Sequence, residues 1–120
     1  MLRTGVDMVE IDRIRRAAAR HGERFYRRFY TERERAHCAG RFSALAVRFA
    51  AKEAVAKALG TGIGDVSWKE IEIRVDNPRK RPTLHLHGAA ADLSRELGIT
   101  QWDVSLTHTE VYASALAVGL

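Results

Sequence analysis

The sequence contains little cysteine and proline and no long apolar run. Its one cysteine, Cys38, excludes an intramolecular disulfide and a zinc site built on several cysteines. No apolar segment approaches the roughly 20 residues that cross a bilayer, so we expect no membrane span. The first ten residues already include Asp7 and Glu10, which argues against a secretory signal. Together these features favour a reducing, cytoplasmic location.

The chain offers no linker at which to divide it, because it has no internal repeat and no low-complexity stretch. A length of 120 residues suits one domain, and we expect that domain to cover residues 1–120. Hydrophobic residues make up 46% and charged residues 29%, which is the balance of an ordinary globular protein. A domain of this size gains from oligomerisation.

Positive charge is concentrated in one segment. Between Arg13 and Arg35, nine arginines stand against three glutamates, a net charge of +6, whereas the whole chain carries +5. Arg16 and Arg20 follow Arg13 at spacings that form a stripe on the first predicted helix. A surface of this kind implies an acidic partner, such as nucleic acid, anionic lipid or an acidic protein.

Periodicity and cap residues predict a mixture of strands and helices. Two runs that alternate with period two flank the turn Asp76-Asn77-Pro78, which is typical of a hairpin. Thr31 and Glu34 have the spacing of a capping box, and Gly60 is suited to end the longest helix. We expect strands at 2–9, 68–75, 83–87, 102–107 and 112–118, and helices at 12–21, 31–39, 42–59 and 88–97. The fold class is therefore α+β with an antiparallel sheet and one long helix.

The longest helix ends in the stretch RFAAKEAVAKALGTGIG, residues 48–64. Its small residues gather on one face, which lets another backbone approach. Glu53 and Lys57 flank that face, and spacing alone suggests a solvated ion pair worth about 0.2–0.5 kcal/mol. The glycines that follow allow close approach of a ligand, and the lysine is placed to meet a phosphate. The segment is not a Walker A loop, in which the lysine follows the glycines.

Asp7 stands near the end of the first predicted strand. A buried aspartate is costly unless it is paired or bound to a cation, and either an arginine or a metal ion meets that need. Asp7 and Glu53 together suit Mg²⁺, which takes one or two protein carboxylates plus substrate phosphates and water. A cation there would neutralise charge that develops on a phosphoryl group.

Three blocks of the chain resemble the signature of the 4′-phosphopantetheinyl transferases. The first is Gly5-x-Asp7 followed by Arg13, the second runs from Phe49 to Gly64, and the third is Asp103-Val-Ser-Leu-Thr-His-Thr109. They occur in the expected order, and the resemblance covers essentially the whole chain. The short length is similar to that of the holo-acyl-carrier-protein synthase type of this family.

The resemblance implies a reaction and an assembly. Members of this type transfer 4′-phosphopantetheine from coenzyme A to a serine of an apo acyl carrier protein, with Mg²⁺, and release adenosine 3′,5′-bisphosphate. They are homotrimers with active sites at subunit interfaces. By position, Asp7 and Glu53 would hold Mg²⁺, and Lys57 would contact the pyrophosphate and stabilise or protonate the leaving group. His108 would act as a general base or as a donor to the ligand.

Further contacts carried over by position concern the donor and the carrier protein. Coenzyme A is expected to meet Arg48, Lys57, Gly60, Thr61, Gly62, Pro82 and His108. Carrier proteins of this kind are acidic, so complementary charge is expected to dock one on Arg13, Arg16, Arg20 and Arg24. A solvated face is the commoner meaning of such a charge run. His85 and His87 share a face of the second hairpin strand, and we interpret them as structural.

The chain departs from the family pattern at two places. Many relatives have a histidine where this chain has Asp103, so a contact from that position is in question. The hairpin of many relatives carries Gly-x-Pro beside the ligand, whereas this chain has Lys80-Arg81-Pro82. Pro82 fits the family role, and Lys80 is expected to affect the shape of the loop.

Two other functions fit parts of the sequence. A small basic module that binds nucleic acid would stack bases on Phe25, Tyr26, Phe29 and Tyr30, which lie among the arginines. That function leaves the two carboxylates and the glycines unexplained. A protein that binds coenzyme A without catalysis is disfavoured, because the expected metal and lysine positions are all present. We therefore expect a Mg²⁺-dependent transferase.

Overall fold

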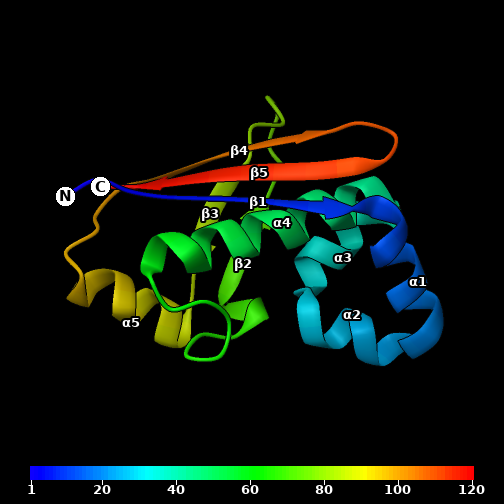
Figure 1. Ribbon diagram of the computed structural model, residues 1–120, viewed down its shortest axis with the longest axis horizontal. Coiled ribbons are helices and arrows are strands. Elements are labelled where there is room, and N and C mark those ends of the chain that lie inside the picture. The colour runs from blue at the N-terminus through cyan, green and yellow to red at the C-terminus, as the bar shows by residue number, and fades with distance from the viewer.

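A three-stranded antiparallel sheet lies on one long helix in the computed structural model, which describes residues 1–120 (Figure 1). The strands lie in the order β1-β5-β4, so the first strand of the chain pairs with the last. The elements are β1 (Arg3–Glu10), β4 (Trp102–His108), β5 (Tyr112–Gly119) and the helix α4 (Phe42–Leu59). The predicted α+β class, antiparallel sheet and long helix are confirmed.

Gly5 allows β1 to lie directly on the backbone of α4. A Cβ atom at this position would stand 1.8 Å from the carbonyl oxygen of Ala54, far inside contact distance. Ala54 and Ala58 supply the facing helix surface, and both are buried. The close approach brings Asp7, two residues further along β1, within reach of the polar edge of α4.

The outer face of this sheet has no helix over it (Figure 1). Alternation along β1 directs Val9 into the core and leaves Val6 and Met8 59% and 63% exposed. Leu116 on β5 pairs with Val6 and is 44% exposed. Exposed apolar side chains that adjoin in this way mark a surface suited to packing against another molecule.

Three short helices cover one end of α4 (Figure 1). They are α1 (Ile11–His21), α2 (Glu23–Phe29) and α3 (Glu32–Cys38). The predicted capping box of α3 is confirmed, because Thr31 and Glu34 each accept from the other's amide. The sequence does not predict α2, which begins after a bend at Gly22 (φ of 58°) and carries Phe25 into the core.

A second, two-stranded antiparallel sheet pairs β2 (Ile71–Arg74) with β3 (Thr83–Leu86), which confirms the predicted hairpin. The strand predicted over 68–75 begins too early, because Ser67 and Glu70 form a capping box that winds Trp68–Glu70 into a 3₁₀ turn, η1. The strand is also covered on both faces and not on one, since Glu72 is buried.

The chain after this hairpin follows the prediction. The helix α5 (Gly88–Glu96) leads into β4, and the other predicted boundaries agree with the structure to within one residue. The hydrophobic core is one cluster of 25 buried residues, and α4 contributes more of them than any other element. None of the helices combines the length and the apolar character that crossing a bilayer requires.

Candidate active site

The ammonium group of Lys57 lies against β1. Its Nζ donates to the carbonyl oxygen of Val6 at 3.0 Å and to Asp7 Oδ1 at 3.2 Å. The ion pair of Lys57 is therefore with Asp7 and not with Glu53, so the solvated pair suggested by helix spacing does not form. The partner of Asp7 is likewise this lysine and not an arginine. The Lys57 side chain stays 52% exposed and accessible to a ligand.

Glu53 stands one helical turn before Lys57, at the same crossing of β1 and α4. Partial burial raises the pKa of the Glu53 carboxyl, and the negative charge of Asp7 raises it further. The positive charges of Lys57 and Arg13 oppose that shift. Four charged groups from β1, α1 and α4 thus act on one another at this crossing.

The donor set at the crossing fits Mg²⁺. Asp7 and Glu53 are close enough for the charge of one to raise the pKa of the other, and a cation relieves that repulsion. No third His, Cys, Asp or Glu side chain joins them. This set suits a hard cation that takes its remaining ligands from phosphate and water, and it does not suit a zinc site with three or four protein ligands.

The glycine-rich loop after α4 is shaped by the end of the helix. Gly60 adopts a left-handed φ of 83°, and the amides of Gly60, Thr61 and Gly62 all donate to the carbonyl oxygen of Ala56. The Thr61 hydroxyl donates to the carbonyl of Gly62. Because these amides are engaged in the cap, the loop presents its Cα surface and not a cradle of free N–H groups.

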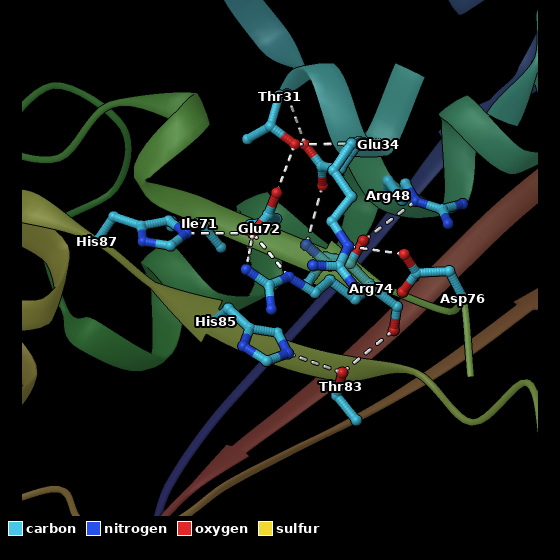
Figure 2. Close-up of polar contacts among 12 residues, drawn as sticks. Thr31, Glu34, Arg48, Ile71, Glu72, Arg74, Asp76, Thr83, His85 and His87 are labelled. Carbon is cyan, nitrogen blue, oxygen red and sulfur yellow. Dashed lines mark hydrogen bonds and ion pairs between the residues drawn. The ribbon is translucent and has the colours of Figure 1, made fainter. Parts of the chain in front are cut away.

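A buried polar network fixes α4 at the residue before Glu53. Lys52 Nζ has no exposed surface and donates to Glu34 Oε1 at 2.8 Å and to the carbonyl oxygen of Ile71 at 2.6 Å. Figure 2 shows Thr31 between the acids Glu34 and Glu72. Its amide donates to the first and its hydroxyl donates to the second. A buried charge is costly unless it is fully paired, and no buried polar side-chain atom lacks a partner here.

Glu72, on β2, connects this network to the second sheet (Figure 2). Burial alone would raise its pKa, but hydrogen bonds from Thr31, His87 and Arg74 outweigh burial and lower the pKa to about 2. The ring of His87 lies 3.2 Å from Glu72, and the ring of His85 bonds a threonine hydroxyl on its own strand at 3.0 Å. Both histidines that the sequence analysis interprets as structural thus have protein partners.

A cavity of about 330 Å³ opens between α1, α2 and α4. Phe25, Phe29 and Phe49 line its apolar part, and Arg13 and Arg24 are among the basic residues around it. The sequence does not predict this cavity, because it depends on α2 and on the packing of Phe49 against it. The charge of Arg13 reaches Glu53, so the cavity adjoins the carboxylate–lysine crossing.

The four arginines predicted to dock a carrier protein differ in their surroundings. Arg13 and Arg24 line the cavity, and Arg20 lies outside it without an ion pair. Arg16 Nε lies 3.3 Å from the carboxylate of Asp12, so part of its charge is neutralised within α1.

The aromatic residues among the arginines are not free to stack bases. Phe25 and Tyr30 are buried, and Phe29 packs into a cluster of aromatic rings. The guanidinium of Arg35 covers the ring of Tyr26 at 4.9 Å. Base stacking requires exposed ring faces, so the nucleic-acid alternative loses the feature that supported it.

A separate hollow of about 260 Å³ lies between α4, the β2–β3 hairpin and β4. Its lining includes Arg41, Arg48, Lys80, His37 and His108, and no acidic residue. Such a lining suits an anionic ligand. Of these groups, only Arg48 and His108 are predicted as ligand contacts from the sequence.

Arg48 lies at the base of this hollow and is 2% exposed. Its guanidinium donates to the carbonyl oxygens of Ile73 and Ala44, and it lies 2.9 Å from His37 Nδ1. Its charge contributes to the hollow although its N–H groups are largely engaged. His108 is exposed, with Nδ1 3.2 Å from the carbonyl oxygen of Thr109.

Pro82 lines a neighbouring hollow of about 430 Å³, which shares Lys80, Val75 and Leu106 with the first. None of Asp7, Glu53 and Lys57 lines either one. Within one chain, the predicted residues therefore fall into two groups. One group surrounds the carboxylate–lysine crossing, and the other lines the hollows along β4.

Comparisons with known proteins identify the family of this chain. The model of the 4′-phosphopantetheinyl transferase superfamily matches residues 3–115, a range that contains both groups. A holo-[acyl-carrier-protein] synthase of Herpetosiphon aurantiacus is 50% identical, over 100% of this chain and 99% of its own. A synthase of Moorella thermoacetica is 46% identical, over 98% and 93% of the two chains.

Solved structures of the same family also match the fold of this chain. The crystal structure of Helicobacter pylori holo-[acyl-carrier-protein] synthase in complex with coenzyme A matches with a TM-score of 0.89 and 31% identity. The match covers 98% of this chain and 99% of that chain. Since sequence and fold agree over nearly the full length, the chain belongs to the 4′-phosphopantetheinyl transferase superfamily.

Proposed function

We propose that this protein transfers the 4′-phosphopantetheine group of coenzyme A to a serine of an apo acyl carrier protein, as a holo-[acyl-carrier-protein] synthase. The observation that carries the proposal is the crossing of β1 and α4, where Asp7, Glu53 and Lys57 act on one another. The names of its relatives support it. Residues 1–120 act as a single domain in this proposal. Its compartment is the cytoplasm, where Cys38, buried and without a partner, remains a thiol.

The reaction exchanges one P–O bond for another. The carrier serine oxygen attacks the phosphorus next to the pantetheine arm and loses its proton to a base. The bond from that phosphorus to the bridging oxygen breaks, and adenosine 3′,5′-bisphosphate leaves with that oxygen and its charge. Lys57, oriented by Asp7 and half exposed, stabilises this charge or supplies a proton to it.

Asp7 and Glu53 would hold Mg²⁺ beside the pyrophosphate. Bound there, Mg²⁺ supplies charge neutralisation at the phosphoryl group. Two carboxylates alone would repel the pyrophosphate, and the raised pKa of Glu53 reflects burial and the same repulsion from Asp7. Lys57 holds Asp7 in place, and the buried bonds of Lys52 hold the helix backbone beside Glu53.

The basic cavity between α1, α2 and α4 is the proposed docking site for the carrier. Arg13, Arg20 and Arg24 offer charge to an acidic helix, while the partly exposed Phe29 and Phe49 offer an apolar contact. Arg16 has a smaller role, because Asp12 already engages it. Because the charge of Arg13 acts on Glu53, a serine docked at Arg13 would lie near the reacting phosphate.

Coenzyme A is proposed to use the hollows along β4 for its nucleotide end. Arg48, His108 and Pro82 line them. Gly60, Thr61 and Gly62, next to Lys57, contact the donor through the surface of their capped loop. His108 then acts as a donor to the ligand or as the general base.

A homotrimer would complete the active site. Two groups of site residues lie apart in one chain, and the exposed apolar side chains of Val6, Met8 and Leu116 offer a packing surface between copies. Association through this sheet face lets the hollows of one subunit adjoin the carboxylate–lysine crossing of the next. A chain of this size also gains stability from such association.

The test of the proposed function is the intact mass of an apo acyl carrier protein after incubation with the enzyme, coenzyme A and Mg²⁺. We expect the carrier to gain the mass of one phosphopantetheine group, and we expect no gain when its acceptor serine is replaced by alanine. A carrier of unchanged mass, from enzyme that is folded by circular dichroism, would overturn the proposal.

A further inference from the structure

Lys80 has a left-handed backbone conformation, with a φ of 52°. Glycine reaches this region easily, whereas a residue with a Cβ atom is strained there. Only Ala39 shares this feature among the other non-glycine residues. Strained backbone persists where the surroundings enforce it, and such residues gather at functional sites. The fold therefore holds Lys80 in a conformation that costs free energy.

Two sets of contacts hold the loop in this shape. The side-chain amide of Asn77 bonds the backbone of Arg81 in both directions, at 2.6 and 3.0 Å. The Lys80 amide donates to the carbonyl oxygen of Asn77 at 2.9 Å. The Arg81 side chain then ties the loop to β4, where it lies 3.0 and 2.9 Å from the two carboxylate oxygens of Asp103.

Lys80 lines both hollows along β4, and its ammonium group forms no hydrogen bond or ion pair within the chain. In the smaller hollow it joins Arg41 and Arg48, with no acidic residue in the lining. Burial lowers the pKa of His37, and the charges of Arg48, Arg41 and Lys80 lower it further against the opposing charge of Asp76. Several cations thus converge on a space whose lining holds no acidic residue.

We propose that Lys80 binds a phosphate group at the nucleotide end of the donor, and that the Arg81–Asp103 ion pair positions it. The ligand in this inference rests on the proposed function, in which coenzyme A is the donor. A glycine at residue 80 would leave the loop unstrained but would add no charge. The lysine adds an ammonium group to a hollow already lined by arginines. The contacts of Asn77 and the ion pair of Arg81 with Asp103 hold its backbone in place.

The test is calorimetric binding of adenosine 3′,5′-bisphosphate to the full chain with lysine or glycine at residue 80. We expect Lys80→Gly to weaken binding by about 10- to 100-fold, as loss of one charged hydrogen bond implies. Binding of 4′-phosphopantetheine, which lacks the nucleotide, should change less than about twofold. Lys80→Gly should also raise the melting temperature, because the strain at this residue is relieved.

Arg79→Gly is the matched control. Arg79 is adjacent, exposed and equally charged, but it lines neither hollow. We expect it to leave the affinity for the bisphosphate within about twofold, since an exposed charge outside the hollows is screened by salt. Asp103→Asn should produce a smaller loss than Lys80→Gly, and that loss should shrink in high salt, as for an exposed ion pair.

Equal affinity of the wild-type chain and Lys80→Gly for the bisphosphate would overturn the inference. So would an equal loss with 4′-phosphopantetheine or with Arg79→Gly. Binding and transfer fail separately. A chain that binds the bisphosphate through Lys80 but never modifies a carrier retains this site and loses the proposed function. If the wild-type chain modifies the carrier but Lys80→Gly binds the bisphosphate as tightly as the wild type, the proposed function stands and the Lys80 site is wrong.

Discussion

Lys57 and Asp7 are 50 positions apart in the chain, yet Lys57 Nζ lies 3.2 Å from Asp7 Oδ1. Glu53, only four residues from Lys57, has no ion pair with it. The contact depends on Gly5, because any larger residue there would keep β1 off the backbone of α4. Helix spacing therefore identifies Lys57 correctly but predicts Glu53 as its partner in place of Asp7. The pair with Asp7 belongs to a candidate active site and is not an ordinary surface ion pair.

The ammonium group of Lys57 can be removed without disturbing the core, because the side chain is half exposed. We predict that Lys57→Ala lowers kcat for carrier modification by about 10²- to 10³-fold, the usual cost of losing one group that stabilises a developing charge. Lys69→Ala is the control, since that exposed lysine lies in η1. A kcat for Lys57→Ala near that of Lys69→Ala would remove Lys57 from the chemistry.

Glu53 should destabilise the protein when no metal ion is bound. Burial, and then the charge of Asp7, raises its folded pKa above the ordinary value of 4.5. The folded state thus holds this proton more tightly than the unfolded state, and stability falls as pH rises from 4.5 through the folded pKa. At neutral pH in EDTA, Glu53→Gln should melt at or above the wild-type temperature.

The same variant separates metal binding from stability. Mg²⁺ should raise the melting temperature of the wild-type protein, because a ligand of the folded state stabilises it by mass action. It should leave Glu53→Gln unchanged. The account of this site would be wrong if Glu53→Gln melted well below the wild type in EDTA, or if Mg²⁺ stabilised both proteins equally.

Gly5 should not tolerate even a methyl group. The added Cβ atom would stand 1.8 Å from backbone, not from a flexible side chain, so β1 or α4 must move. We predict that Gly5→Ala lowers the free energy of unfolding by about 3 kcal/mol or more, the upper end of overpacking, and lowers activity with it. Urea denaturation measures the change. Glu96→Ala, exposed at the end of α5, should stay within about 0.5 kcal/mol of wild type.

Acid should weaken the network around Glu72. Its folded pKa of about 2 lies below the ordinary value of 4.5, so its contribution to stability is present above pH 4.5 and is lost as pH falls towards 2. Glu72→Gln should cost about 1–3 kcal/mol at neutral pH and should flatten the dependence between these pH values. Urea denaturation in a pH series measures both, and identical slopes for the two proteins would contradict this assignment.

Two arginines of α1 and α2 provide a matched pair for the docking surface. Arg24 lines the cavity, whereas Arg16 is engaged by Asp12 outside it. We predict that Arg24→Ala raises KM for the carrier by about 10-fold and that Arg16→Ala raises it by less than about threefold. Each variant removes one positive charge, so equal effects would indicate attraction by net charge and not a defined docking site.

Much of the fold could be predicted from the sequence because its signals are local. The Thr31 capping box, the left-handed Gly60 and the alternation of the strands each depend on neighbouring residues, and each is confirmed. The early start of the strand before Ile71 is wrong for a similar reason. The capping box at Ser67 is a local signal too, but it competes with an alternating pattern.

The parts of the site that the sequence does not predict depend on contacts between distant segments. Nothing local marks Lys52 as buried, because its partner Glu34 belongs to another helix. The cavity beside Phe49 exists only once α2 packs on α4. Likewise, Asp103 and the stretch Lys80-Arg81-Pro82 are two separate departures in the sequence, and the fold joins them through the ion pair of Arg81 with Asp103.

The most direct test of the central claim is the rate of carrier modification across a Mg²⁺ titration, followed by intact mass, for the wild type, Asp7→Asn and Glu53→Gln. The account predicts that the wild-type rate rises with Mg²⁺ and saturates. It predicts that either variant, folded as judged by its melting temperature, is slower by at least about 100-fold at every Mg²⁺ concentration. Modification by a folded Glu53→Gln variant at the wild-type rate would contradict it.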